Sequence, residues 1–332
     1  MPDLIVGTPT GLHCAPGGFH VDPAGAADVA VLTHVHSDHA RPGSRTYLCA
    51  EPSVPFVRKR LGPDAPVRGV PYGERVRLGS VELSFHPAGH VLGSAQVRIE
   101  SEGEVWVVSG DYKRAPDPTC LPFEVVPCDV FVTEATFGLP IYRWDEPAGV
   151  VAQILEWWDR NRAAGVASVL FCYAMGKAQR ILAELSRLTD RTALVHGAVQ
   201  ALTDLYRQAG IGMLPTEPVA EQPAKRSYAG ELILAPVSAS GSIWMRRFGA
   251  CETAFASGWM RVRGTRRRKG YDRGFVLSDH ADWPALLRTV QDTGARRVRV
   301  THGYADELAR YLAERGYDTG VLPTAYEGEA DI

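Results

Sequence analysis

Residues 33–39 read Thr-His-Val-His-Ser-Asp-His and place three imidazoles and one carboxylate within six positions. His34 and His36 are two positions apart, so an extended backbone points both side chains the same way. Asp38 and His39 follow where the chain must turn, and they can face a second metal ion. Neutral imidazole and carboxylate are the ligands that zinc and its divalent neighbours prefer. The segment therefore predicts a metal centre on a loop at the end of a strand.

Further polar residues follow other short apolar runs in the first half of the chain. The runs span 28–33, 81–85, 104–109 and 129–133, and they end at or near the histidine segment, His90, Asp111 and Glu134. Apolar runs of this length are typical of buried strands. Loops beyond the carboxyl ends of strands are where functional sites usually lie. We therefore expect these four groups to share one site.

Three more residues complete a ligand set for two metals. His90 follows Gly89, Asp111 follows Gly110, and His302 follows another apolar run. Alone, each of these residues would be interpreted as an ordinary loop or strand-end polar group. Beside the histidine segment, we assign His34, His36 and His90 to one metal and Asp38, His39 and His302 to the other, with Asp111 and a water bridging them. Zinc is the expected metal and manganese the alternative, since histidine and aspartate accept both.

Length and composition set the broad class. At 332 residues the chain is long enough for about two domains, and its formal net charge of -2 predicts no global attraction to nucleic acid or membranes. The six cysteines form no Cys-x-x-Cys pair, which favours a reducing compartment over a disulfide framework. Neither a basic leader nor a membrane-length apolar run is apparent. A cytoplasmic enzyme without membrane association is the expectation.

The middle of the chain alternates between strand and helix patterns. Expected helices span 146–164, 177–188 and 199–208, and expected strands span 168–172, 193–195 and 231–235. This alternation predicts a parallel sheet. A strand at 275–277, a helix at 283–292, a strand at 297–300 and a helix at 305–315 are expected to close the chain. We expect a domain from 1 to 144, an inserted domain from 145 to 260, and the C-terminal part of the first domain from 261 to 332.

The motif order resembles a known fold family. His-x-His-x-Asp-His at 34–39, Gly-His at 89–90 and Gly-Asp at 110–111 are similar to the ligand motifs of the metallo-β-lactamase fold. The resemblance implies an αββα sandwich. Asp22 matches the aspartate of that fold's first motif, which supports the ligand loop without binding metal. These motifs indicate fold and metal but not substrate.

Three later motifs resemble those of the β-CASP nucleases, a branch of this fold family. Residues 133–138 look like the acidic motif A, with Glu134 as its carboxylate, and residues 277–282 look like motif B, with His280. Residues 301–303 look like motif C, with His302. Residues 173–180 are similar to a helix start in the inserted β-CASP domain. The resemblance implies an α/β β-CASP domain inserted into the sandwich.

Two further stretches resemble one bacterial group within that family. Residues 236–248 and 257–263 are similar to the DNA-ligase-associated exonucleases of the DNA damage response, which are also labelled mRNA 3′-end processing factor-like. The resemblance implies a partnership with a DNA ligase and a helicase. His302 favours the RNA alternative, because a histidine at motif C is typical of the RNA-directed members.

If the reaction is phosphodiester hydrolysis, the residues of the later motifs have expected roles in it. His280 is the candidate general acid for the leaving oxygen, and Glu134 is the carboxylate expected to orient it or His302. Asp38 counts as a catalytic residue as well as a ligand. Without the motif match, His280 would be interpreted as a polar residue at the start of a helix.

Basic residues are concentrated in the inserted domain and just beyond it. Arginine binds phosphate through a planar fork, and neighbouring aromatic residues can stack on the bases of a single strand. A solvated surface is the alternative interpretation, and for Lys177 it is a simple surface lysine. The expected nucleic-acid contacts are Arg246, Arg247, Arg261, Arg263, Arg266, Arg267, Arg268, Lys269 and Lys177.

The function expected from the sequence is therefore a dinuclear-metal-dependent exonuclease that trims DNA ends in repair and binds single-stranded DNA or DNA ends. The nearest alternative is an RNA 3′-end processing exo- or endoribonuclease. A small-molecule hydrolase such as a thioesterase or lactamase is a more distant alternative. A catalytically inactive scaffold is disfavoured, because every expected ligand position is filled.

Overall fold

The computed structural model describes residues 3–219, 227–262 and 270–324. The chain divides into two compact units: unit 1 contains Met1–Arg143 and His280–Asp331, and unit 2 contains Trp144–Asp279. Unit 2 is thus inserted into unit 1. The sequence placed the boundaries after residues 144 and 260, whereas this division falls after 143 and 279. The second boundary lies later because β17 (Arg273–Phe275) pairs with β16 (Cys251–Ala256) of unit 2.

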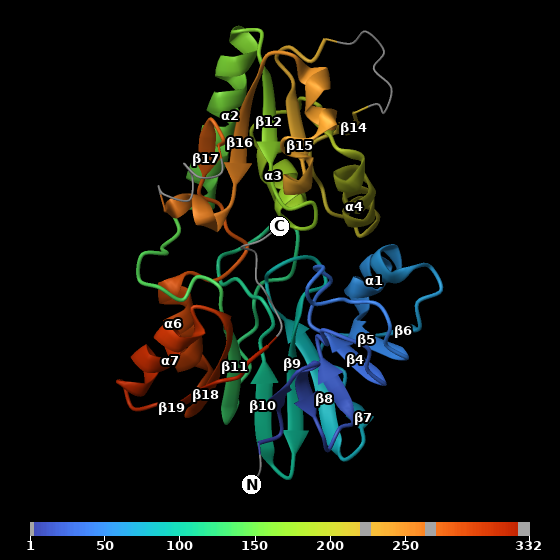
Figure 1. The fold of residues 1–332 in the computed structure, drawn as a ribbon, viewed down its shortest axis with the longest axis vertical. Coiled ribbons are helices and arrows are strands. Elements are labelled where there is room, and N and C mark those ends of the chain that lie inside the picture. Colours follow the sequence, from blue (N-terminus) through green and yellow to red (C-terminus); the bar gives the residue numbers. More distant parts are fainter. Residues whose placement is uncertain (1–2, 220–226, 263–269, 325–332) are drawn as a thin grey trace. The chain divides into compact units, whose positions relative to one another are not determined.

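The first sheet of unit 1 is built from the N-terminal strands in chain order (Figure 1). The strands β1 to β3 pair antiparallel, and β3 to β6 pair parallel. A 3₁₀ helix, η1, and helix α1 connect β5 to β6. The elements are β1 (Val6–Thr8), β2 (Gly11–Cys14), β3 (Phe19–Val21), β4 (Val29–Leu32), β5 (Thr46–Ala50), η1 (Glu51–Ser53), α1 (Val54–Leu61) and β6 (Val67–Val70).

The second sheet of unit 1 has the order β19-β18-β11-β10-β9-β8-β7. Strands β19, β18, β11 and β10 are parallel to one another, and β9, β8 and β7 continue antiparallel. Its strands are β7 (Val76–Leu78), β8 (Val81–Pro87), β9 (Ala95–Ser101), β10 (Glu104–Val108), β11 (Val130–Ala135), β18 (Arg297–Gly303) and β19 (Asp318–Val321). Strands that precede and follow the inserted unit therefore meet in this sheet.

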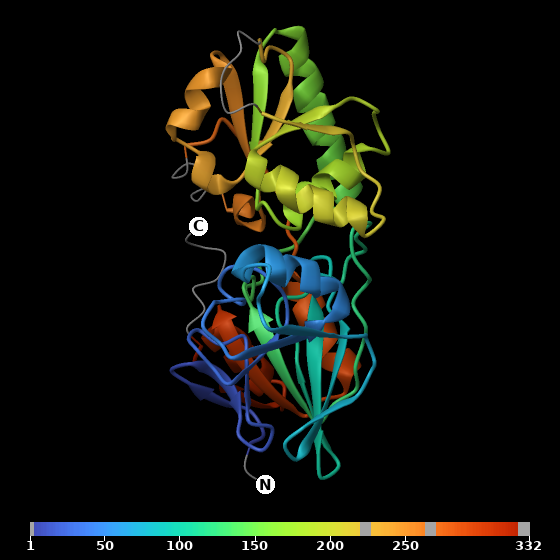
Figure 2. The ribbon, with the colours of Figure 1, turned by 90° about the vertical axis from the view of Figure 1, so that its right-hand side faces the viewer.

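The two sheets of unit 1 pack face to face over an apolar core. Phe19 and Leu48 of the first sheet are buried in one cluster with Phe85 and Trp106 of the second. The helices α6 (Trp283–Thr293) and α7 (Ala305–Ala313) cover the other face of the second sheet (Figure 1, Figure 2). Helix α1 packs beside β6 of the first sheet. This arrangement is the α/β sandwich that the motif order predicted.

Unit 2 is built on a parallel sheet with the order β14-β13-β15-β12-β16-β17. The parallel sheet expected from the strand and helix alternation is confirmed. The other elements are α2 (Pro147–Ala163), β12 (Ala167–Phe171), α3 (Lys177–Leu185), β13 (Ala193–Val195), α4 (Gly197–Gln208), β14 (Thr216–Pro218), β15 (Leu232–Ala235), η2 (Val237–Ala239), η3 (Ile243–Phe248) and η4 (Gly258–Arg261).

Both faces of this sheet are covered, which explains its continuous apolar strands. Leu170 and Leu234 face α2, α3 and α4 in one buried cluster. Phe171 and Phe255 lie in a second cluster with Phe248 of η3. Alternate residues of a strand point to opposite faces, so one buried strand supplies both cores.

Two expected strand ends lie elsewhere in the structure. The strand expected at 275–277 is β17 at Arg273–Phe275, because its register places Phe275 opposite Ala256. Glu134, expected beyond a strand, lies inside β11.

The expected helix at 283–292 is α6. The Asp282 side chain accepts a hydrogen bond from Ala285 N at 3.0 Å, and Gly294 ends the helix in the left-handed conformation.

No helix within the described ranges combines the length and apolar character needed to span a membrane.

A bulge interrupts the pairing of β11 with β18. Thr133 pairs with Val300 but Ala135 pairs with Gly303, so β18 carries one extra residue over this interval. Such bulges redirect side chains near functional sites. Gly303 follows with φ of +77°, and a Cβ there would lie 2.3 Å from the carbonyl oxygen of Ala135. Only glycine permits this close approach of the two strands.

Replacing Gly303 tests this close approach. Gly303→Ala is expected to cost more than about 2 kcal/mol, because strain at positive φ is joined by a clash with backbone atoms. A loss of about 2 kcal/mol should lower the melting temperature of a unit of this size by roughly 4–8 °C. Gly294→Ala is the matched control: φ there is +71°, but nothing lies within 4 Å of the added Cβ. Equal melting temperatures for the two variants would contradict the close-packing argument.

Candidate metal centre

The histidine segment is held by Asp22, which follows β3. The Asp22 carboxylate accepts a hydrogen bond from Thr33 N at 2.8 Å and one from Thr33 Oγ1 at 2.5 Å. Its Oδ2 also lies 2.8 Å from Nδ1 of His39. Asp22 is buried and has φ of 44°, a strained conformation for a residue with a side chain. The carboxylate of Asp22, whose own backbone is strained, therefore fixes both the beginning and the end of the segment.

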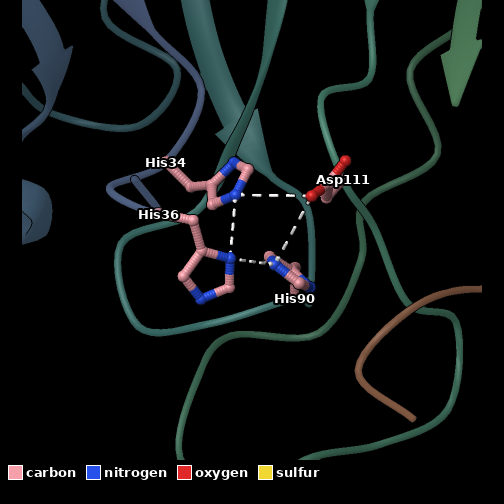
Figure 3. A group of neighbouring side chains, drawn as sticks. All are labelled: His34, His36, His90 and Asp111. Carbon is pink, nitrogen blue, oxygen red and sulfur yellow. Dashed lines mark hydrogen bonds and ion pairs between the residues drawn. The ribbon is translucent and has the colours of Figure 1, made fainter. Parts of the chain in front are cut away.

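Three imidazoles converge beside Asp111 (Figure 3). Nδ1 of His36 lies 3.1 Å from Nε2 of His34 and 3.2 Å from Nε2 of His90. Nε2 of His34 lies 3.4 Å from Oδ2 of Asp111. One ligand atom from each of these four residues lies within 4.8 Å of all the others. The sequence predicted that these residues meet, and the structure brings them together.

Two of the remaining predicted ligands, His39 and His302, also contact this carboxylate, and Asp38 contacts His39. Nε2 of His39 lies 3.4 Å from Oδ2 of Asp111, and Nε2 of His302 lies 3.2 Å from Oδ1. Oδ2 of Asp38 is 3.7 Å from Nε2 of His39, and its side chain is partly exposed. Each oxygen of Asp111 thus faces at least one imidazole.

In His34 and His302, the ring nitrogen that does not face Asp111 contacts a threonine hydroxyl. Nδ1 of His34 lies 3.1 Å from Thr33 Oγ1, and Nδ1 of His302 lies 3.1 Å from Thr301 Oγ1. Such contacts on one ring nitrogen fix the orientation of the ring and leave the other nitrogen for a metal. The ordinary pattern around metal-binding histidines is therefore present.

Electrostatics also favour a cation at this point. Burial lowers the pKa of His34 well below its ordinary value. Burial would also lower the pKa of His39, but the carboxylates of Asp111, Asp38 and Asp22 outweigh it and hold that pKa well above the ordinary value. The three carboxylates thus favour positive charge at His39, beside a His34 ring that burial keeps neutral. Divalent cations supply that charge, and this donor set suits zinc or manganese.

Two loops are packed so that His90 and Asp111 approach each other. Lys113 N donates a hydrogen bond to the carbonyl oxygen of Ala88 at 3.1 Å. A Cβ on Gly110, where φ is +56°, would lie 2.5 Å from Cβ of Thr33. The glycine before Asp111 therefore allows its loop to pack against the histidine segment.

A second buried pair, formed by His280 and Glu134, lies beside this cluster. Nδ1 of His280 lies 2.9 Å from Oε2 of Glu134, and both side chains are 1% exposed. Oε1 of Glu134 also accepts a hydrogen bond from Tyr112 N at 2.8 Å. The His280 ring centroid is 4.8 Å from that of His90. The structure thus joins the predicted motif A carboxylate to the motif B histidine and places the pair beside the ligands.

The segment formed by η1 and α1 contacts the loops of both His90 and His36, and the sequence analysis missed it. Ser53, just before α1, donates from Oγ to the carbonyl oxygen of Gly93 at 2.8 Å. Arg60, in its last turn, donates from Nε to the carbonyl oxygen of Val35 at 2.8 Å. The only sequence signal was a short run of three basic residues, which resembles a solvated surface.

The expected contact of Lys177 with phosphate needs correction. The Lys177 side chain is fully buried, and its Nζ lies 3.0 Å from Oδ2 of Asp279. A buried, paired ammonium is not presented to a nucleic-acid strand. Its place at the start of α3 suggested exposure, but the partner that buries it comes from a distant part of the sequence.

The other expected nucleic-acid contacts are only partly described. Arg246 and Arg261 are exposed, and Arg261 Nη1 lies 3.3 Å from Oδ2 of Asp145. The Arg247 guanidinium lies 5.4 Å from the ring centroid of Trp244. The remaining expected contacts lie outside the described residues: Arg263, Arg266, Arg267, Arg268 and Lys269.

Asp22→Asn tests the support of the ligand segment. Loss of the charged partner of His39 should weaken metal affinity by roughly 10–100-fold, as for other residues that orient metal-binding histidines. Titration of the metal-free protein with zinc against a chromophoric chelator measures this change. Asp28→Asn is the control, because the Asp28 side chain is exposed and forms an ion pair with the exposed Arg45. Unchanged zinc affinity in Asp22→Asn would contradict the assigned role.

Comparisons with known proteins agree with this geometry, although no protein-family model matches the chain. A probable DNA ligase of Opitutus terrae is 30% identical over 94% of this chain and 30% of that protein. A ribonuclease of Thermus thermophilus is 30% identical over 51% of this chain and 44% of that protein. The chain therefore spans less than half the length of these curated relatives.

A solved structure supports the fold. A crystal structure of a protein of unknown function from Enterococcus faecalis has a TM-score of 0.59 with 12% identity, over 91% of this chain and 80% of that one. These relatives agree with the motif order and the converging histidines, which resemble those of the metallo-β-lactamase/β-CASP nucleases.

Proposed function

We propose that this chain is a metal-dependent nuclease that hydrolyses phosphodiester bonds and acts as an exonuclease trimming DNA ends in repair. The observation that carries the proposal is the buried His280–Glu134 pair beside the histidine cluster, 2.9 Å between Nδ1 and Oε2. Hydrolysis of a phosphodiester needs a proton for the leaving oxygen, and a carboxylate-paired imidazole beside the metal ligands supplies one.

We assign the ligands to two ions. His34, His36 and His90 form one group, Asp38, His39 and His302 form the other, and Asp111 lies between the groups. Its carboxylate contacts a member of each group: Oδ2 lies 3.4 Å from Nε2 of His34 and 3.4 Å from Nε2 of His39, and Oδ1 lies 3.2 Å from Nε2 of His302, which supports this bridging role. Two divalent ions, zinc with manganese as the alternative, would activate a water and neutralise charge on the phosphoryl oxygens.

His280 then moves a single proton. Glu134 holds Nδ1 of the ring, so Nε2 is the nitrogen that transfers the proton. As the water oxygen bonds to phosphorus, the bond to the leaving oxygen breaks and that oxygen takes the proton. The proton released by the water restores His280. Phosphodiester and water thereby become a phosphomonoester and an alcohol.

Arginines and aromatic residues of the inserted unit are proposed to bind the strand. The exposed Arg246 and Arg261 lie on the same unit as Trp244, whose ring is 5.0 Å from that of His196. Rings can stack on bases while guanidinium groups bind phosphates. The basic residues of 263–269 are proposed to bind the strand as well. Lys177 is not, because it is buried and paired with Asp279.

DNA is the proposed substrate, as single strands or frayed ends, and RNA is the alternative. Similarity to part of a probable DNA ligase supports DNA and a ligase as partner. Similarity to a ribonuclease supports RNA. We also propose a helicase as partner and the cytoplasm as the location.

The proposal is tested with single-stranded DNA and RNA of the same sequence, labelled at one end, in zinc or manganese. The DNA should shorten progressively from one end, and a chelator should abolish the reaction. Circular single-stranded DNA of the same length should persist, because an exonuclease needs an end. His34→Ala is the matched inactive enzyme.

Three outcomes contradict parts of this proposal. Faster cleavage of the RNA would favour the RNA alternative. Cleavage of the circle would show an endonuclease. Hydrolysis of a thioester or lactam with neither nucleic acid touched would identify a small-molecule hydrolase.

The proposed contact of the basic residues of 263–269 with nucleic acid is tested by the salt dependence of binding. Arg267→Ala combined with Arg268→Ala should weaken DNA binding and flatten the plot of log affinity against log salt by roughly 0.7 per lost phosphate contact. Fluorescence anisotropy with a labelled oligonucleotide measures this slope. Arg45→Ala, which removes an exposed arginine of unit 1, should leave the slope unchanged. An unaltered slope in the double variant would identify the stretch as an ordinary solvated surface.

A further inference from the structure

A buried charged cluster immediately precedes His280 in the chain. Oδ2 of Asp279 lies 3.0 Å from Nζ of Lys177, and its Oδ1 lies 3.2 Å from Nη1 of Arg180. Nη1 of Arg180 also donates to the carbonyl oxygen of Ser278 at 2.7 Å. None of the three charged side chains is more than 2% exposed. The cluster therefore holds both the side chain and the backbone of the segment that leads to His280.

Charges buried this deeply are costly and call for an explanation. Removing ions from water is costly, so a buried pair adds little net stability compared with apolar residues of similar volume. Buried ionic groups instead restrict the chain to one arrangement in several proteins. Here they join the start of α3 to residues 278–279, two segments far apart in the sequence.

The first turn of α3 is built to present both cations. Lys177 and Arg180 are three positions apart, so they lie on one side of the helix. Gly176 precedes the helix with φ of 86°, and its N–H donates to Oε1 of Gln179 at 2.8 Å. The Lys177 ammonium also lies 5.5 Å from the ring centroid of Tyr173. The positions of both cations are thus set by the helix start itself.

The chain on the other side of His280 is also held. Ala281 N donates to the carbonyl oxygen of Tyr112 at 2.6 Å, and Asp282 caps α6. Nδ1 of His280 lies against Glu134. Asp279 is the last residue of unit 2 in this segment, and His280 is the first of unit 1. The imidazole therefore stands between two anchored stretches of backbone.

We propose that Lys177, Asp279 and Arg180 form a positioning cluster for His280, which fixes the backbone so that Nε2 can reach the leaving oxygen. This inference rests on the proposed function, and it gives a role to three buried charges that the proposed reaction does not use. None of the three touches the substrate. Their loss should therefore impair proton transfer to the leaving group and spare metal binding.

The test compares two forms of the same oligonucleotide. One is ordinary, and in the other the bridging oxygen of the leaving group is sulfur; sulfur substitutions on either side of phosphorus are both prepared. A thiolate leaves without needing a proton, so general-acid catalysis matters only for the ordinary substrate. The oligonucleotide is DNA or RNA, whichever the wild-type protein hydrolyses faster.

Asp279→Asn should lower kcat on the ordinary substrate by roughly 10–100-fold, within the range of general-acid contributions. KM and bound metal should stay unchanged, and kcat on the sulfur substrate should fall less than about threefold. In a His280→Ala background, Asp279→Asn should cause no further loss, because the two residues act through one step. If Asp279→Asn fails to fold, Lys177→Met is used for the same comparison.

Glu184→Gln is the matched control, because Glu184 lies in the same helix, α3, and pairs with the exposed Arg187 that follows it. It should leave both rates unchanged. Equal losses on both substrates, or additive losses in the His280→Ala background, would overturn the positioning role and indicate general destabilisation. A wild-type protein that cleaves neither substrate would instead overturn the proposed function itself.

Discussion

The carboxylate of Asp111 is the group around which this structure is organised. It is only 5% exposed, and its two oxygens lie 3.2–3.4 Å from the imidazoles of His34, His39 and His302. A buried anion is costly unless positive charge and hydrogen bonds surround it. Divalent metal ions would meet that requirement, and the segment of 33–39 and the loops of His90 and Asp111 are held by contacts of their own.

Backbone geometry, more than side-chain choice, positions these groups. Asp22 accepts a strained conformation to hold Thr33 and His39, and a bulge in β18 places His302 opposite the strand that carries Glu134. Strained or irregular backbone persists where surrounding structure enforces it, and it is common at functional sites. Two β-sheets with apolar cores supply the rigidity for this enforcement.

The sequence predicted the fold and the convergence of the ligands, because periodicity and motif order are local signals. It could not predict contacts that depend on tertiary packing. Lys177 has the local pattern of an exposed helix-start lysine, yet Asp279 buries it. Arg60 supports the loop of His34 and His36 from a helix that reads as a basic surface. The position of β17, two residues before the expected strand, likewise depends on its pairing with β16, and the bulge in β18 depends on its pairing with β11.

The central claim is that Asp111 joins two metal ions in one site. Anomalous scattering from crystals of the zinc-loaded protein tests it most directly. We predict two peaks about 3.5–4 Å apart, one beside His34, His36 and His90 and one beside His39 and His302, with the Asp111 carboxylate touching both. A single peak, or two peaks with Asp111 bound to only one of them, would contradict the account.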